Sequence, residues 1–152
     1  MRLVGSRNAQ AITGLTADQL REWSGRRGLV SPEIPARGKG TQARFSWQNL
    51  LLLRICATLK SQTHVELAAY RDDIEVLQER ISDRSFHSLW NSAVVFGDAS
   101  PLVLERRQIL EHESDQPYIF VSLRPHLHAI TGGLGIQEPV AQLPLFPVIG
   151  LR

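Results

Sequence analysis

The chain has 152 residues, the size of one domain or of one domain with a small appendage, and 43% of them are hydrophobic, so it can bury a core. Its single cysteine, Cys56, excludes an internal disulfide framework and a zinc cluster built from thiolates. No apolar run approaches the roughly 20 residues that span a membrane, and no signal peptide is evident, so we expect a cytoplasmic protein.

The net charge of +2 conceals a strong asymmetry along the chain. Residues 1–60 carry ten Lys/Arg and three Asp/Glu, whereas residues 61–152 carry seven Lys/Arg and twelve Asp/Glu. This distribution favours a polyanionic partner for the first half only. The alternative is a solvated basic surface that has no partner.

Two short helices are predicted near the N-terminus. The first covers residues 7–13. The second begins after Thr16, which is a suitable N-cap, and Gln19 stands in the capping-box position three residues later. A pair of glycines, Gly25 and Gly28, ends this second helix.

The next segment, residues 31–45 (SPEIPARGKGTQARF), is rich in proline, glycine and cations. We interpret it as a hairpin-like excursion whose tip is made flexible by Gly38 and Gly40. Its cations are Arg37, Lys39 and Arg44.

Two longer helices should follow. Ser46 caps a strongly apolar one, in which Cys56 is expected to be a small buried hydrophobe. The other is predicted over residues 63–81, because its apolar side chains follow the spacing of a coiled-coil seam. They could pack on the chain's own domain or pair with a second copy. A dimer could also form through a sheet in the C-terminal half, instead of this seam or together with it. The seam consists of Leu67, Tyr70, Ile74, Leu77 and Ile81.

Beyond Asp83 the pattern changes to short strands. We predict strands at residues 93–96, 102–105 and 118–123, and a short helix that starts at Pro125. The whole chain is therefore predicted to be α+β. The expected division is a basic domain (1–60), a linking or dimerisation helix (61–83), a small α+β domain with a short antiparallel sheet (84–131) and a Pro/Gly-rich tail (132–152).

The first half of the chain resembles the MerR family of bacterial transcriptional regulators over residues 8–80. The matching segments are Thr13-Gly14-Leu15-Thr16, Leu20-Arg21, Arg26-Arg27-Gly28-Leu29-Val30-Ser31-Pro32 and Phe45-Ser46-Trp47. The resemblance implies a winged helix-turn-helix that binds double-stranded DNA, a homodimer on a two-fold site, and a nucleoid-associated location. The family's effector-binding cysteines are missing, so a metal-sensing version is not expected.

In such a domain the start of the second helix enters the major groove, where short polar side chains reach the base edges. Glutamine can pair with adenine and arginine with guanine, while the wing grips phosphates or a minor groove. The DNA-binding candidates are Thr16, Asp18, Gln19, Arg21, Arg26, Arg27, Arg37, Lys39 and Arg44.

The C-terminal tail offers a second candidate motif. The segment Gln142-Leu143-Pro144-Leu145-Phe146 resembles the peptide that docks bacterial replication and repair proteins on the sliding clamp. In one alternative the chain is therefore a replication or repair adaptor, and in another the tail folds back on its own domain. A third alternative is a protein-interaction module whose basic face meets an acidic partner.

Enzymatic chemistry is not expected. His126 and His128 are two residues apart, which places them on different sides of a helix, and no cysteine or carboxylate has ligand spacing nearby. No phosphate-binding loop and no nucleophile elbow is present. We expect neither a cofactor nor a bound metal.

Overall fold

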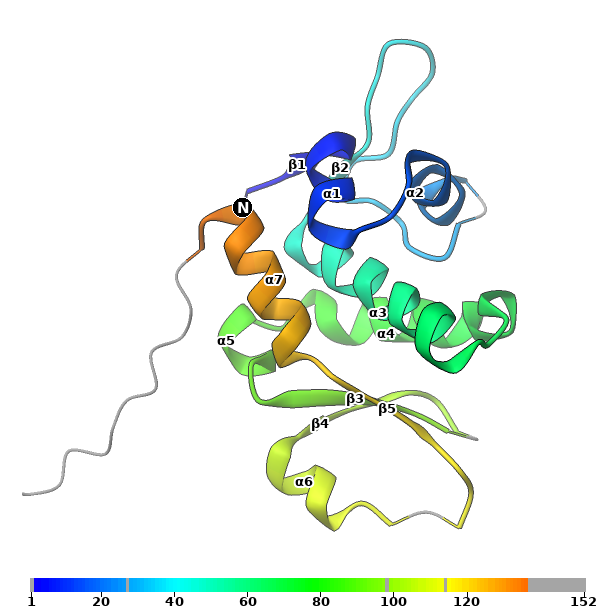
Figure 1. The fold of residues 1–152 in the computed structure, drawn as a ribbon, viewed down its shortest axis with the longest axis vertical. Coiled ribbons are helices and arrows are strands. Elements are labelled where there is room, and N and C mark those ends of the chain that lie inside the picture. The colour runs from blue at the N-terminus through cyan, green and yellow to red at the C-terminus, as the bar shows by residue number, and fades with distance from the viewer. Residues whose placement is uncertain (1, 27, 98, 114, 137–152) are drawn as a thin grey trace, which may run out of the picture.

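The computed structural model of the chain describes residues 2–26, 28–97, 99–113 and 115–136 (Figure 1). Within them, helices combine with two small antiparallel sheets, so the predicted α+β class is confirmed. Arg27 and the clamp-like segment Gln142–Phe146 lie outside the described residues. No helix in the described part is long and apolar enough to cross a membrane.

The two predicted N-terminal helices are present as α1 (Ser6–Thr13) and α2 (Ala17–Ser24), and strand β1 (Val4–Gly5) precedes them. Gly14 ends α1 with a φ of 74°, which L-residues with a side chain rarely adopt. Thr16 caps α2 with the predicted reciprocal box, in which its hydroxyl accepts from the Gln19 backbone N–H.

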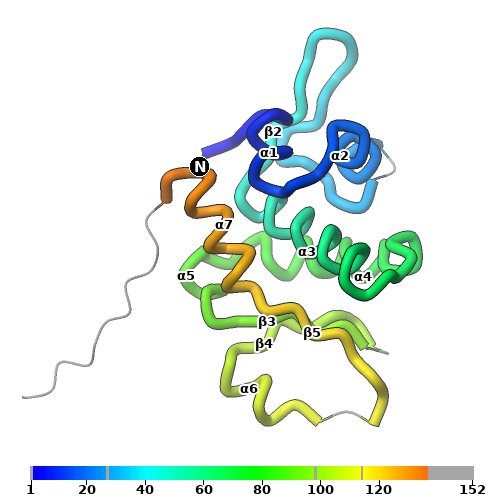
Figure 2. Tube along the Cα trace, viewed as in Figure 1, coloured from blue at the N-terminus to red at the C-terminus, as the bar shows by residue number. Residues whose placement is uncertain are grey.

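The chain then projects away from α1 and α2 as the 34–44 loop, which is defined by the pairing of Ile34 with Arg44 and is clear in Figure 2. Both residues donate a backbone hydrogen bond to the other's carbonyl, at 3.1 and 2.8 Å. The tip contains Gly38 and Gly40, with φ values of 82° and 85°. The loop returns through β2 (Arg44–Phe45), which pairs with β1.

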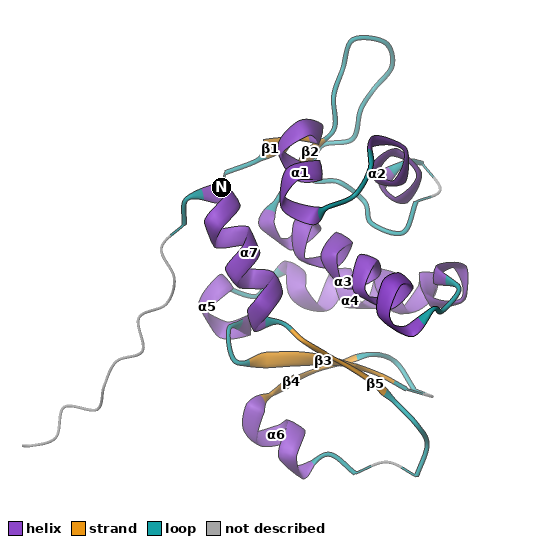
Figure 3. Cartoon of the chain, viewed as in Figure 1, coloured by secondary structure: helices purple, strands orange, loops and turns teal. Residues whose placement is uncertain are grey.

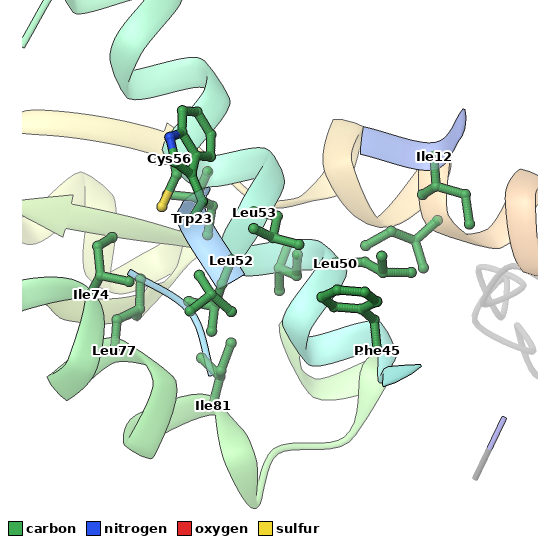
Figure 4. Packing of buried hydrophobic residues seen from close by; sticks show 14 of the residues in the cluster. Ile12, Trp23, Phe45, Leu50, Leu52, Leu53, Cys56, Ile74, Leu77 and Ile81 are labelled. Carbon is green, nitrogen blue, oxygen red and sulfur yellow. The ribbon is translucent and has the colours of Figure 1, made fainter. Parts of the chain in front are cut away.

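Helix α3 (Trp47–Thr63) forms the centre of the molecule. Four consecutive leucines, Leu50 to Leu53, are fully buried, as is Cys56. A helix that is apolar on all sides must be covered on all sides. Figure 4 shows Trp23, Phe45, Ile74 and other core side chains around it.

The helix predicted over 63–81 begins in the wrong place. His64 takes a left-handed conformation with φ 54°, and the chain turns back through a 3-10 helix, η1 (Leu67–Tyr70), into α4 (Arg71–Ser82). This reversal lets α4 pack antiparallel to α3 instead of extending away from it.

The proposed dimerisation seam is also corrected, because the chain's own core already occupies it. Leu67, Ile74, Leu77 and Ile81 are all buried within the single chain. Tyr70 is half-buried and packs edge-to-face on Phe96, with ring centroids 5.8 Å apart. Of the two alternatives, packing on the chain's own domain is the one observed.

The predicted strands appear as β3 (Ser92–Phe96), β4 (Leu102–Glu105) and β5 (Ile119–Ser122), which form an antiparallel sheet in the order β4-β3-β5. A short helix, α5 (Phe86–Leu89), precedes the sheet. Helix α6 (Arg106–Glu111), which was not predicted, lies between β4 and β5. Figure 3 shows α3 and α4 between the sheet and the α1–α2 end of the molecule.

Helix α7 (Arg124–Leu134) carries the chain back past α3 to α1, and it extends beyond the predicted start of the tail at Gly132. Glycines usually end a helix, but here Gly133 continues α7 and permits a close approach to Ile12 of α1. Buried side chains from Val4 to Leu134 belong to one hydrophobic cluster, so the three segments expected within this span pack as one unit.

Candidate nucleic-acid interface

A groove of about 750 Å³ separates α2 from the 34–44 loop. Helix α1 contributes Ser6 and Gln10 to it. Helix α2 and the residues after it contribute Ala17, Leu20, Arg21, Ser24, Gly25 and Arg26, while the other wall comes from Ser31, Pro32, Pro35, Ala36, Arg37, Thr41, Gln42 and Ala43. The groove therefore has one helical wall and one loop wall.

The charge along the groove has one sign. Arg21 and Arg26 stand on the helical wall and Arg37 on the loop wall, and no carboxylate is among the described residues that line it. Lys39 and Arg44 lie farther along the loop and are exposed. Cations on both walls of one groove favour an extended anion that runs between them.

The start of α2 is more constrained than the sequence indicated. The Thr16 hydroxyl accepts from the Gln19 N–H, and the Gln19 Oε1 accepts from the Thr16 N–H, both at 3.1 Å. A bidentate contact with adenine needs the carboxamide oxygen and nitrogen together. The cap already uses the Gln19 oxygen as an acceptor, so a bidentate contact with adenine would require that oxygen to accept a second hydrogen bond or the cap to open.

Asp18 and Arg21 remain available at the surface. Their side chains form an i, i+3 ion pair at 3.5 Å and are 91% and 79% exposed. An exposed pair of this kind contributes little to folding stability. Its effect is to hold the guanidinium beside the start of α2, at the rim of the groove.

Two amide side chains that sequence reasoning missed hold the base of the loop. Asn49 of α3 accepts from the Glu33 N–H at 2.8 Å and donates to the Ser31 carbonyl at 3.0 Å. Gln78 of α4 makes a second pair of hydrogen bonds with the backbone of Ser31. Asn49 also completes the capping box of Ser46, a pattern that could have marked it as structural.

Of the predicted DNA-binding residues, the structure therefore brings Arg21, Arg26 and Arg37 into one groove. Thr16, Asp18 and Gln19 lie at the start of α2, next to it. Polar lining residues that were not predicted are Ser6, Gln10, Ser24, Ser31, Thr41 and Gln42. Their only signal in the sequence is their proximity to the cations.

Two titratable groups outside the groove have strongly shifted pKa values. Burial raises the pKa of Cys56 to about 12, so its thiol stays protonated. Burial, and then the nearby charge of Arg54, lowers the pKa of His126 to about 4. No group of three His, Cys, Asp or Glu that could hold a metal ion occurs within the described ranges.

No protein-family model matches the chain, and no curated protein matches its sequence. The function must therefore be inferred from the groove, from the charges on its two walls and from the elements that carry them.

Proposed function

We propose that the chain is a sequence-specific DNA-binding regulator of transcription in which α1, α2 and the 34–44 loop form a winged helix-turn-helix. The observation that carries the proposal is the arrangement of cations on both walls of one groove. Arg21 and Arg26 come from the helical wall and Arg37 from the loop wall.

The shapes of the two walls fit the grooves of duplex DNA. The major groove, about 12 Å wide, admits a helix such as α2, and the narrower minor groove admits a thin loop. One sugar-phosphate strand separates the two DNA grooves, so it would lie between α2 and the 34–44 loop. Arg26 on the helical wall and Arg37 on the loop wall then contact the same strand of phosphates.

The order of elements supports this interpretation. A helix, a tight turn at Gly14, a second helix, a projecting loop and a long buried helix follow one another, and this is the order that the resemblance to MerR regulators implies. The clamps from Asn49 and Gln78 would hold the loop at a fixed distance from α2, as recognition of a rigid duplex requires.

Asp18 and Arg21 are the residues best placed to read bases. Arginine can contact guanine bidentately, and a carboxylate can accept from the cytosine amino group. Their ion pair orients both side chains before the duplex is bound. Lys39, on the exposed loop, would contact phosphate and carry no sequence information.

The test is selection of random-sequence duplexes by the intact chain, followed by affinity measurements on the selected and mismatched duplexes. We expect Arg21→Ala to weaken binding to the selected duplex by about 1–3 kcal/mol and to leave binding to mismatched DNA nearly unchanged. Lys39→Ala should weaken both by a similar factor. Equal affinity of Arg21→Ala and the parent chain for the selected duplex would remove Arg21 from the reading face.

A further inference from the structure

The side of the β4-β3-β5 sheet that faces away from α3 is apolar, and α6 covers part of it. Val94 and Phe96 of β3 belong to the core, so Val95 between them faces the opposite side. The register pairs Val95 with Leu102 on one neighbour and Phe120 on the other, and residues directly opposite share a face. We call this side, together with α6, the outer sheet face.

Exposed apolar side chains are concentrated there. Among the described residues, five large hydrophobic side chains are exposed, and only Ile34 is on the 34–44 loop. The other four are Leu102, Leu110, Tyr118 and Phe120. Leu110 projects from α6 and is 82% exposed, which costs free energy unless another surface covers it.

A protruding side chain and a hollow stand side by side on this face. A groove of about 320 Å³ runs between α6 and the sheet, with Leu110 and Ile109 on one side and Phe120 on the other. A surface that carries both a protruding side chain and a groove can bind a copy of itself, because two-fold symmetry places the side chain of each copy opposite the groove of the other.

The charges on the face are also arranged for self-association. The Arg106 backbone N–H and the Arg124 guanidinium both donate to Asn91, so these two residues lie at the Ser92 end of β3. Glu105 lies at the same end, opposite Ser92, and offsets one of the positive charges there. His112 packs on Tyr118 with ring centroids 5.2 Å apart, which places the acidic residues beside it at the Phe96 end. The two ends of β3 are about 13 Å apart. The exposed acidic side chains there are Glu111, Glu113 and Asp115.

We propose that the outer sheet face is a two-fold interface between two copies of this chain. Leu110 of each copy enters the groove beside Phe120 of the other, and the arginine end of each face meets the acidic end of its partner. The seam from Leu67 to Ile81 takes no part, since it is buried within the chain.

This interface has a consequence for DNA that rests on the proposed function. The α2–loop groove and the outer sheet face lie at opposite ends of the long axis (Figure 1). In a two-fold contact through a face, the axis lies in the plane of that face, so the two DNA-binding grooves point in opposite directions. The dimer would then hold two separate duplex segments and bridge them, instead of reading adjacent half-sites of one palindrome.

The interface is tested by sedimentation equilibrium of the full chain. We expect a dimer that Leu110→Glu weakens at least about tenfold, while Ile34→Ser, the matched exposed apolar residue on the other end, leaves it unchanged. A parent chain that stays monomeric up to about 100 µM overturns the proposal and leaves the face to another protein or to the chain's own C-terminal segment.

Charge reversal gives a sharper signature. One variant carries Arg106→Glu and Arg107→Glu, and the other carries Glu111→Lys and Glu113→Lys. Acids at the start of α6 and cations at its end suit the helix dipole, so neither variant should misfold. Each alone should be monomeric, whereas an equimolar mixture should dimerise. A mixture that stays monomeric contradicts the two-fold pairing.

Bridging is measured separately, by capture of a labelled duplex on beads that carry a second duplex. The parent chain should capture it, and Leu110→Glu should bind the bead duplex yet capture none. Failure of the parent chain to bind the bead duplex would contradict the proposed function. A dimer that binds the bead duplex but captures no labelled duplex would refute the opposed orientation of the grooves.

Discussion

Gly133→Ala should destabilise the folded chain through one contact between α7 and α1. A Cβ added at Gly133 would lie 2.3 Å from Cγ1 and 2.8 Å from Cδ1 of Ile12. Carbon atoms attract each other best at about 3.5–4.0 Å, so the Ile12 side chain must leave its rotamer or one of the two helices must move by more than about 1 Å. Overpacking of this kind costs about 1–3 kcal/mol.

The neighbouring glycine supplies the control. A Cβ at Gly132 meets nothing within 4 Å, although it lies on the same helix. Both substitutions gain up to about 1 kcal/mol because alanine favours a helix more than glycine does. That gain cancels in the comparison, so the difference between the two variants isolates the steric cost, about 1–3 kcal/mol.

Urea denaturation followed by tryptophan fluorescence measures both free energies of unfolding. Gly132→Ala should be as stable as the parent or slightly more stable, and Gly133→Ala should be less stable. In an Ile12→Ala background the space is vacant, and Gly133→Ala should become neutral or stabilising. Equal midpoints for the two glycine variants would refute the close packing of α7 on α1.

Three further predictions concern the loop and the buried titratable groups. Asn49→Ala removes the hydrogen bonds that hold the loop base at Ser31 and Glu33, so DNA affinity should fall at least about fivefold even at temperatures where circular dichroism shows the chain fully folded. The pKa of His126 is about 4 in the folded chain, against the ordinary 6.5, so its imidazole stays neutral there while the unfolded chain binds a proton. The free energy of unfolding should therefore decrease as the pH falls from 6.5 toward 4. Chemical denaturation should show a loss of about 1–2 kcal/mol across that window, and His126→Gln should flatten it. Cys56 should react with a thiol reagent only at the rate of unfolding, because its pKa of about 12 and its burial protect it; rapid labelling of the native chain would contradict this.

Local signals in the sequence predicted the elements that they begin or end. Thr16 with Gln19, and Ser46 with Asn49, cap α2 and α3 through side chains that reach only three residues along the chain. Likewise, short apolar runs separated by turn and loop residues were sufficient to locate the three strands of the sheet. Interactions this short in sequence are readable without knowledge of the rest of the fold.

The predictions that were wrong or ambiguous concern positions whose structure depends on contacts with residues far away in the sequence. His64 adopts a left-handed conformation, although no glycine marks the position, and α4 then packs on α3. Gly133 continues α7, where glycine usually signals an end, because Ile12 needs the space. The heptad from Leu67 to Ile81 was ambiguous for the same reason, since its spacing suits an internal core as well as a partner.

The sequence predicted the cations of the candidate site but not the side chains that hold the loop in place. Arg21, Arg26 and Arg37 are conspicuous in a basic segment, and they share one groove. Nothing in the spacing of residues shows that Gln78, far along the chain, holds Ser31 in place. Likewise, the occupation of the Gln19 oxygen by the helix cap becomes visible only when the geometry is known.

The most direct test of the central claim is the affinity of the intact chain for a duplex of about 25 base pairs as the salt concentration is raised. With four to seven cations on phosphates, log K should fall against log salt with a slope of about −4 to −6. The triple variant Arg21→Ala, Arg26→Ala, Arg37→Ala should reduce the magnitude of that slope by about 2 to 3. A control triple at the end of α3, on α4 and after α4, Lys60→Ala, Arg80→Ala, Arg84→Ala, should keep it. Absence of binding at about 50 mM salt, or equal loss in the two triples, would contradict DNA binding through this groove.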